Sequence, residues 1–221
     1  APIKVTKIGS RSKKPLFNDE EISFYQDVLL LADDPDIDIV LELIGGVDIA
    51  KELVRKAIIN GKHVITANKA LIASHGEELF SLAQKHSVSL RFEAAVAGSI
   101  PIVKVLRESL SSNKISCVTG IINGTTNYIL SEMAVSDRSF SDILSEAQEL
   151  GFAEADPTFD IEGIDAGHKL VILASLAFGI PLSLDELSVE GMSQISIADL
   201  KSASELGYGI KHLAVARLVD E

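Results

Sequence analysis

The 221-residue chain has no tryptophan and only one cysteine, Cys117. A single cysteine excludes an intrachain disulfide and suits a reducing compartment, so a cytoplasmic protein is expected. No apolar run reaches the roughly 18 residues that a membrane-spanning helix needs, so no membrane partner is expected. Basic residues are few, with 20 Lys and Arg against 32 Asp and Glu, and the net charge of −12 argues against a nucleic-acid or anionic-membrane surface.

Motifs of several common enzyme and metal sites are also missing. The five histidines have no H-E-x-x-H spacing, and the chain contains no P-loop and no G-x-S-x-G turn. A calcium loop beginning at Asp156 would place Thr158 and Ile161 where an EF-hand needs an acidic residue and a glycine. Residues 1–20 contain no G-x-G-x-x-G, so either the chain is not a dinucleotide-binding fold or its first βα unit lies outside these residues.

What is present in the first half is an alternation of short strands and helices. Strands are expected at residues 3–8, 36–43, 62–67 and 87–92, and helices at 47–60 and 71–86. Short connections between such elements indicate a right-handed parallel α/β sheet, in which ligands bind at the carboxyl ends of the strands. The segments that follow the strands are 9–14, 44–46, 66–69 and 93–98.

Two other segments leave alternatives open. Arg11, Lys13 and Lys14 form a basic cluster after the first strand, which is either a site for a ribose 2′-phosphate or a solvated turn. Residues 123–127 precede a helix whose first backbone N–H groups either hold a carboxylate or are simply capped by Thr or Asn. The remaining elements are expected to be a strand at 115–122 and helices at 102–110, 128–133, 139–150, 196–204 and 210–218.

The most unusual segment is residues 149–179, which begins acidic and ends as an apolar helix. Lys169 follows Asp165 by four residues, so the two share one helix face with the apolar Ile172 and Leu176. A lysine on such a face is rarely buried without a partner. One interpretation is a solvated acidic loop and a core helix with a snorkelling lysine, and the other is a functional site in which the acids and the lysine act together.

Blocks of sequence spread over the whole chain resemble one known family. VTGIINGTTNYIL (118–130), followed by ELGFAEADPTFDIEGIDAGHKLVILA (149–174), resembles the signature of the homoserine dehydrogenases. ELIGG (42–46), VITANKAL (64–71) and EAAVAGSIPI (93–102) match the same family in the same order. The resemblance implies the reversible reduction of L-aspartate 4-semialdehyde to L-homoserine with NADP or NAD as cofactor, in the pathway from aspartate to threonine, methionine and isoleucine.

The resemblance also implies an architecture. The fold class is α/β, with an incomplete Rossmann-type parallel sheet at 1–100 and an α/β (α+β) substrate-binding and dimerisation domain at 101–221. Because the family's opening Gly-rich loop and later catalytic segments are missing, a central fragment of a longer enzyme is expected. The expected partners are a small amino-acid substrate and a second copy, giving a homodimer. The alternatives are a non-catalytic dimerising or substrate-binding fragment and a related amino-acid semialdehyde dehydrogenase.

Roles in the reaction are carried over from the family to matching positions. Lys169 would be the general acid and base at the substrate oxygen, and Lys69 a second catalytic lysine near the nicotinamide. Asp165 would orient the reacting end, and Glu154 and Asp160 would hold the substrate amino group. These roles agree with the chemistry, because hydride transfer to an aldehyde develops negative charge on an oxygen that a lysine ammonium can stabilise or protonate.

The resemblance assigns binding positions as well. Gly124 and Thr125 match the loop that contacts substrate, while Phe152 stands where some family members have a tyrosine, so a hydroxyl contact is lost there. The expected cofactor-binding residues are Ile44, Gly45, Lys69 and, from the basic cluster, Arg11. A monovalent cation, Na⁺ or K⁺, would be bound largely by backbone oxygens of Glu93, Val96, Gly98 and Ile100.

Overall fold

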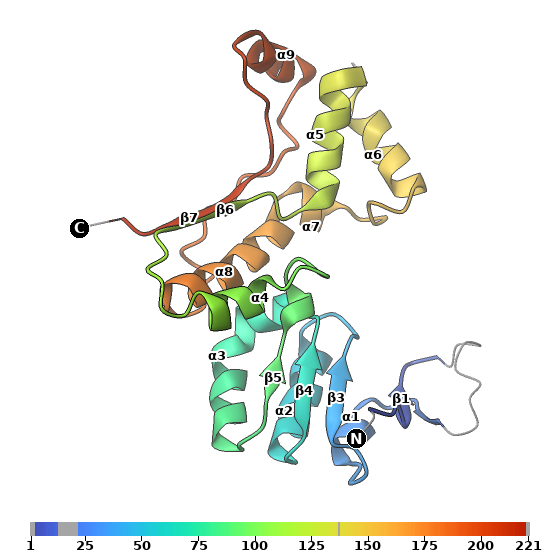
Figure 1. Cartoon of the computed structure of the whole chain (residues 1–221). Coiled ribbons are helices and arrows are strands. Elements are labelled where there is room, and N and C mark those ends of the chain that lie inside the picture. Colours follow the sequence, from blue (N-terminus) through green and yellow to red (C-terminus); the bar gives the residue numbers. More distant parts are fainter. Residues whose placement is uncertain (1–2, 13–21, 137, 220–221) are drawn as a thin grey trace. The chain divides into compact units, whose positions relative to one another are not determined.

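The computed structural model of the protein describes residues 3–12, 22–136 and 138–219. The chain divides into two units, Ala1–Ser109 and Leu110–Glu221, and each is described by itself (Figure 1). Among the described residues, no helix is both long enough and apolar enough to cross a lipid bilayer.

The first unit is built on a three-stranded parallel sheet. Its strands pair in chain order: β3 (Ile39–Glu42), β4 (His63–Thr66) and β5 (Leu90–Arg91). The connecting helices are α2 (Asp48–Ile59) and α3 (Lys69–Lys85). Val64 lies opposite Val40 on one side and Leu90 on the other. The predicted alternation of strands and helices and the parallel α/β class are therefore confirmed.

Side chains along β3 and β4 alternate between exposed and buried, so one face of this sheet packs on the core. The inward residues of β3 and β4 are buried: Val40, Glu42, Val64 and Thr66. Helix α2 contacts both strands through a buried apolar stripe of Leu53, Val54, Ala57 and Ile58. Burial of each large aliphatic side chain stabilises the fold by about 1.5–3 kcal/mol, so this stripe holds the strand ends, and the loops that follow them, in place.

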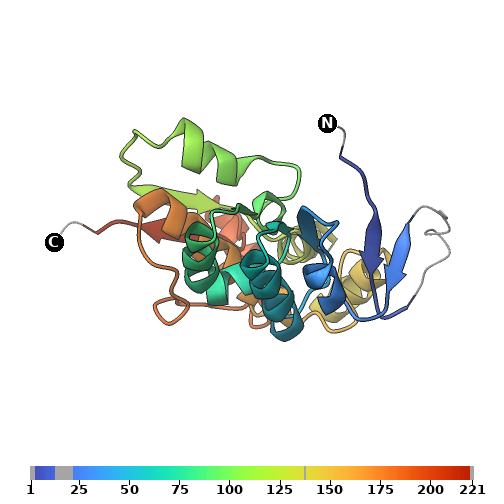
Figure 2. The same cartoon turned by 90° about the horizontal axis from the view of Figure 1, so that it is seen from below.

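A second, two-stranded parallel sheet forms from β1 (Lys7–Gly9) and β2 (Ser23–Tyr25) (Figure 2). This sheet is separate from the three-stranded one, whereas residues 9–14 were expected to follow a strand of the main sheet. The place of this segment at a ligand-binding edge stays a prediction. No strand was predicted at residues 23–25, so the partner strand β2 was missed. Arg11 is exposed beyond β1, and Lys13 and Lys14 lie outside the described residues.

A buried carboxylate ties this small sheet to the end of helix α1 (Leu29–Asp33). The Lys7 ammonium pairs with Asp34, and the Tyr25 hydroxyl donates to Asp34 Oδ2 over 2.9 Å. The backbone N–H of Asp36 donates to Asp34 Oδ1 over 3.0 Å. The hydrogen bond from Lys7 lowers the pKa of Asp34 from 3.8 to about 2.

The first unit ends in a helical segment whose start is capped by an acidic side chain. Its parts are a 3₁₀ turn, η2 (Glu93–Ala95), helix α4 (Ile102–Lys104) and a π-helical turn, η3 (Val105–Ser109). The helix predicted at 102–110 is therefore present, with its second half widened to a π turn. The Glu93 carboxylate accepts the backbone N–H groups of Val103 and Lys104, each over 3.0 Å. These donors have no partner within the helix, so the acid stabilises its first turn.

The second unit is mainly helical. Its helices are α5 (Gly124–Ser136), α6 (Phe140–Glu149), α7 (Thr158–Ile161), α8 (Ile164–Phe178) and α9 (Ile197–Glu205). A buried cluster joins α5, α6, α7 and α9: Ile129, Leu130, Met133, Ile143, Ile161, Met192 and Leu200. Strand β6 (Cys117–Gly120) leads directly into the loop that precedes α5.

The helix predicted at 210–218 is wrong. The structure places strand β7 (Ala214–Arg217) there, antiparallel to β6 with Val215 opposite Thr119. The spacing of the apolar residues in this segment is compatible with one face of a helix and also with a strand. Pairing with β6 decides between the two, because it satisfies the backbone groups of both segments at once.

Candidate active site

The acidic segment of the second unit folds back on itself between α7 and α8. Gly163 joins the two helices with a φ of +79°, a left-handed conformation in which a side chain would be strained. A Cβ at Gly163 would also lie 3.0 Å from Val189 Cγ1 and 3.2 Å from the His212 ring. The glycine therefore permits both the turn and the close packing of the histidine on it. The turn sends Asp160, from α7, and Asp165, from α8, to one common partner.

Lys169 and Asp165 form an ion pair within α8. Lys169 Nζ lies 2.6 Å from Asp165 Oδ2 and donates a second hydrogen bond to the carbonyl oxygen of Ile122 over 2.8 Å. The side chain of Asp165 is 5% exposed and that of Lys169 is 18% exposed. The lysine is thus held by a carboxylate and a carbonyl while part of it stays accessible, as a reacting group requires. This geometry favours the functional interpretation over a snorkelling lysine.

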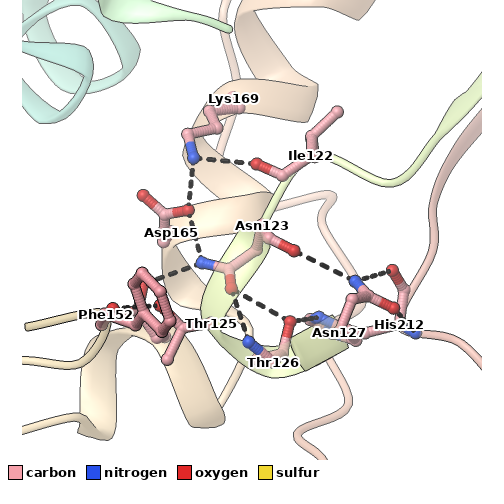
Figure 3. A network of polar contacts seen from close by, with 10 residues as sticks. Ile122, Asn123, Thr125, Thr126, Asn127, Phe152, Asp165, Lys169 and His212 are labelled. Atoms are coloured by element: carbon pink, nitrogen blue, oxygen red, sulfur yellow. Dashed lines mark hydrogen bonds and ion pairs between the residues drawn. The ribbon is translucent and has the colours of Figure 1, made fainter. Parts of the chain in front are cut away.

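Asn123 is the common partner of the two acids, and it was missed as a site residue (Figure 3). Its Nδ2 donates to Asp160 Oδ1 over 2.7 Å and to Asp165 Oδ2 over 2.8 Å. Its Oδ1 accepts the backbone N–H of Thr126 over 2.9 Å. Because a backbone N–H can only donate, the amide oxygen must face Thr126 and the amide nitrogen must face the carboxylates. Residues 123–127 were expected either to hold a carboxylate with backbone N–H groups or simply to cap the helix, and neither alternative predicted that the Asn123 side chain bridges two acids.

The expected substrate loop lies beside this cluster. Gly124 is the first residue of α5, and the Thr125 hydroxyl donates to the carbonyl oxygen of Phe152 over 2.9 Å. The Phe152 ring meets the edge of Tyr128 at a centroid distance of 5.3 Å and remains 57% exposed. The structure therefore brings Thr125 and Phe152 together, and it holds the residue that replaces the family's tyrosine at the surface of the unit.

Glu154 stands apart from these contacts. It is exposed in the loop between α6 and α7, where the Gln148 amide donates to the backbone carbonyls of Glu154 and Ala155 over 3.0 and 3.2 Å. Asp156 accepts the backbone N–H of Thr158, and its hydrogen bonds to Thr158 lower its pKa. These hydrogen bonds fix the backbone of the loop. Within the described residues, they do not involve the Glu154 carboxylate.

A cavity of the second unit lies on another side of α8. Its volume is about 450 Å³, and its walls include Ala166, Gly167 and Leu170 together with His212. Neither Asp165 nor Lys169 lines it. The candidate site is therefore defined by its side-chain chemistry and not by the size of a hollow.

In the first unit, a polar network organises the loops at the carboxyl ends of β3 and β4. Glu42 is fully buried and accepts the Thr66 hydroxyl over 2.5 Å and the Ile44 backbone N–H over 2.9 Å. Asn68 caps α3 by accepting the Leu71 N–H over 3.0 Å. The Asn68 amide also donates to the carbonyl oxygen of Gly46 over 2.6 Å. The network holds the 44–46 turn next to the start of α3, where Lys69 is the first residue. Glu42 and Thr66 were not predicted.

The 44–46 turn is open enough for a nucleotide to approach its backbone. Gly45 and Gly46 have φ values of +70° and +71°, and no heavy atom lies within 4 Å of the place that a Cβ would take on either. The turn and the first residues of α3 therefore fit a cofactor at the carboxyl edge of the sheet. This supports the expected positions of Ile44, Gly45 and Lys69, which all lie at that edge.

The expected cation site lies in a strained turn. Ala97 and Ser99 both have positive φ values, +49° and +70°, on either side of Gly98. The carbonyl oxygens of Ala97 and Ile100 accept the N–H groups of Ile100 and Ile102 over 2.9 and 2.8 Å. Within the described ranges, no group of three or more His, Cys, Asp or Glu side chains is arranged to hold a metal ion. A cation at Glu93, Val96, Gly98 and Ile100 stays a prediction.

Both units match families of known proteins. Residues 1–93 match the family model described as homoserine dehydrogenase, NAD binding domain, and residues 101–220 match the model described as homoserine dehydrogenase. The chain belongs to the homoserine dehydrogenase family. The predicted resemblance is thereby confirmed, as is the Rossmann-like class of the first unit.

Relatives of this family cover nearly the whole chain. The homoserine dehydrogenase of Pseudomonas aeruginosa is 57% identical over 215 residues, which are 97% of this chain and 50% of that protein. The crystal structure of a homoserine dehydrogenase from Thiobacillus denitrificans is 56% identical with a TM-score of 0.87, covering 90% of this chain and 46% of that one. A hyperthermophilic archaeal homoserine dehydrogenase in complex with NADPH is 28% identical with a TM-score of 0.75, covering 88% of this chain and 57% of that one. The chain spans about half the length of the curated relatives that it matches.

Proposed function

We propose that these residues serve an NAD(P)-dependent homoserine dehydrogenase, which interconverts L-aspartate 4-semialdehyde and L-homoserine in amino-acid biosynthesis. The observation that carries the proposal is the Asp165–Lys169 pair, bridged to Asp160 by Asn123, in a chain of this family. An ammonium held by a carboxylate and a carbonyl suits an oxygen that gains negative charge, and further acids suit a substrate that carries its own ammonium group.

Lys169 is the group that exchanges a proton with the substrate oxygen. In the reductive direction, the nicotinamide cofactor supplies a hydride to the aldehyde carbon when it is bound. The Lys169 ammonium donates a proton to the oxygen, which becomes the alcohol of homoserine. In the reverse direction, the neutral Lys169 amine accepts the hydroxyl proton, and the oxidised nicotinamide cofactor would accept the hydride from the same carbon. Asp165 holds the lysine in place through a charged hydrogen bond.

Asp160 and Glu154 are proposed to bind the substrate ammonium group. Asp160 is half-buried and anchored by Asn123, so its position is fixed before substrate binds. Glu154 is exposed on a loop that is fixed through its backbone, so its carboxylate would be able to reach the substrate ammonium group. Gly124 and Thr125 would contact the remainder of the substrate at the start of α5. A charged substrate lowers the repulsion among these acids, which contributes to its affinity.

The cofactor is proposed to bind in the first unit, at the edge formed by Ile44, Gly45 and Lys69. The open glycine turn and the start of α3 support this position. Arg11 would contact a 2′-phosphate, and NADP is therefore proposed to be accepted beside NAD. Na⁺ or K⁺ is proposed for the strained turn at Glu93, Val96, Gly98 and Ile100.

A homodimer and a cytoplasmic location complete the proposal. The exposed strand edges and apolar residues of β6 and β7, which include Val215 at 43% exposed, would support pairing with a second copy. The single cysteine suits a reducing compartment. Sedimentation velocity would decide the oligomeric state, and a monomer at micromolar concentration would contradict the dimer.

The decisive experiment is oxidation of L-homoserine, followed by the absorbance of NAD(P)H. It is run on the 221-residue chain and on the product of the complete natural reading frame. Lys169→Met is expected to lower kcat by about 10²–10⁴-fold with an unchanged circular dichroism spectrum. Lys201→Met, at an exposed lysine of α9, is the matched control and should keep full activity.

Three results would contradict the proposal. Near-normal turnover of Lys169→Met would remove the role given to this lysine. Faster turnover of a related amino alcohol than of L-homoserine would favour another amino-acid semialdehyde dehydrogenase. Binding of L-homoserine without turnover in both proteins would favour a non-catalytic substrate-binding function.

A further inference from the structure

His212 lies far along the chain from the acids of the candidate site but is attached to the same network. It precedes β7 and is held against α5 by a pair of hydrogen bonds with Asn127. The His212 N–H donates to Asn127 Oδ1 over 2.9 Å, and Asn127 Nδ2 donates to the His212 carbonyl oxygen over 3.0 Å. This pairing resembles that of two peptide groups and fixes the backbone of the histidine.

The imidazole of His212 then reaches Asn123 through one hydroxyl group. His212 Nδ1 lies 3.2 Å from Thr126 Oγ1, and Thr126 Oγ1 donates to Asn123 Oδ1 over 3.0 Å. The hydroxyl has a single hydrogen, and Asn123 Oδ1 can only accept. Because that hydrogen points to Asn123, the hydrogen between Thr126 and His212 must belong to His212 Nδ1. The donors are therefore ordered in one direction, from His212 to Asn123.

At the other end of this chain of hydrogen bonds, one amide nitrogen holds two carboxylates. Asn123 Nδ2 has two hydrogens and gives one to Asp160 and one to Asp165. If the Asn123 side chain turned, its oxygen would face two acids and both would lose a donor. Thr126 is fully buried and Asn123 is 4% exposed, so water does not readily replace a lost contact there.

We propose that His212 and Thr126 are positioning residues that, together with the Thr126 backbone N–H, hold the Asn123 amide in place, and through it the spacing of Asp160 and Asp165. The inference rests on the proposed function, in which Asp160 holds the substrate ammonium and Asp165 holds Lys169. Neither positioning residue touches substrate. Loss of their hydrogen bonds misplaces the substrate relative to the lysine, which lowers turnover and weakens substrate binding.

Matched variants separate the hydrogen bonds from packing. Thr126→Val keeps the shape of the side chain without the hydroxyl, whereas Thr126→Ser keeps the hydroxyl. His212→Leu removes the donor, whereas His212→Asn offers an amide N–H close to the position of Nδ1. We expect Thr126→Val and His212→Leu to lower kcat/KM for L-homoserine by up to about 100-fold per folded molecule, and the other two variants to remain near wild type.

The double variant Thr126→Val/His212→Leu tests whether the two residues act as one unit. Its loss should be no larger than that of the more damaging single variant, because each single change already breaks the same chain of hydrogen bonds. The KM for NAD(P) should stay unchanged in every variant. Additive losses, or equal activity of Thr126→Val and Thr126→Ser, would overturn the inference.

Two measurements that do not depend on catalytic turnover test the positioning roles separately from the proposed function. Nitrogen-15 NMR of the His212 ring is expected to show a hydrogen on Nδ1, and a crystal structure of Thr126→Val should show Asn123 displaced from one or both acids. A ring protonated at Nε2 alone, or an unmoved Asn123, would reject the positioning roles even in an active enzyme. An inactive wild type with the expected tautomer and the expected movement would reject the function and leave the positioning intact.

Discussion

Each unit contains a lysine–aspartate pair that is largely buried, and the two pairs have different consequences. In the first unit, Lys7 of β1 pairs with Asp34 after α1, so the contact joins segments 27 residues apart. In the second unit, Lys169 and Asp165 lie four residues apart on one helix, so their contact does not connect separate segments of the chain. A pair of the second kind contributes only about 0.3–0.5 kcal/mol to a helix when exposed.

The surroundings of the two carboxylates sharpen this difference. Asp34 is satisfied by three donors from its own surroundings, Lys7, Tyr25 and the Asp36 N–H, and its pKa is lowered to about 2. Asp165 shares one oxygen between Lys169 and Asn123, and Asn123 connects it to a second acid. A pair that crosslinks the fold is a stabilising element. A buried pair that crosslinks no distant segments and gathers further charge is better explained by chemistry.

The largest expected effect is a difference in turnover between variants of the two aspartates. Asp165→Asn should lower turnover of L-homoserine by about 100-fold, because Lys169 loses the carboxylate that places it. Asp34→Asn should leave turnover per folded molecule unchanged. Steady-state kinetics with the folded fraction measured for each variant would check both, and equal losses in the two variants would erase the distinction drawn between the pairs.

A smaller effect tests whether the first unit uses its lysines for stability. Lys62 is 5% exposed and donates to the carbonyl oxygens of Asp34 and Ile37 over 2.5 and 2.8 Å. Lys62→Met removes the donor to the Ile37 oxygen and leaves the Asp34 oxygen only the Ile37 N–H over 3.3 Å, so the free energy of unfolding should fall by about 1–3 kcal/mol. Lys56→Met, which breaks an exposed pair with Asp33, should cost about 1 kcal/mol or less. Urea denaturation would measure both, and a larger loss for Lys56→Met would refute the assignment.

The smallest effect is a dependence of stability on pH. The pKa of Asp34 is lowered from 3.8 to about 2, so its pairing stabilises the fold fully above pH 3.8 and this contribution is lost as the pH falls toward 2. The difference in urea midpoint between wild type and Asp34→Asn should therefore shrink over that range. Asp36→Asn, at a side chain 82% exposed, is the control and should show a nearly constant difference. A difference for Asp34→Asn that grows on acidification would contradict the sign.

Local patterns were enough to predict most elements of the fold. Helices α2, α3, α6 and α9 were predicted within a few residues, because each presents an apolar stripe and ends at a glycine or another stop signal. Strands β3, β4 and β5 follow from apolar runs between short loops. Strand β7 was missed because its apolar residues fit the period of a helix as well as that of a strand. Only its pairing with β6 favours the extended form.

The candidate site also has features that local sequence predicts and features that depend on tertiary contacts. By its sequence alone, the chain determined its family, its parallel sheet and the neighbourhood of Asp165 and Lys169, because one helical turn places residues four apart on one face. The tertiary structure alone decided that Asn123 bridges Asp160 and Asp165, which lie 37 and 42 residues away from it. It also decided that Glu42 holds the cofactor-side turn and that His212 reaches Asn123 through Thr126. Such contacts depend on how distant segments pack, and local periodicity carries no information about them.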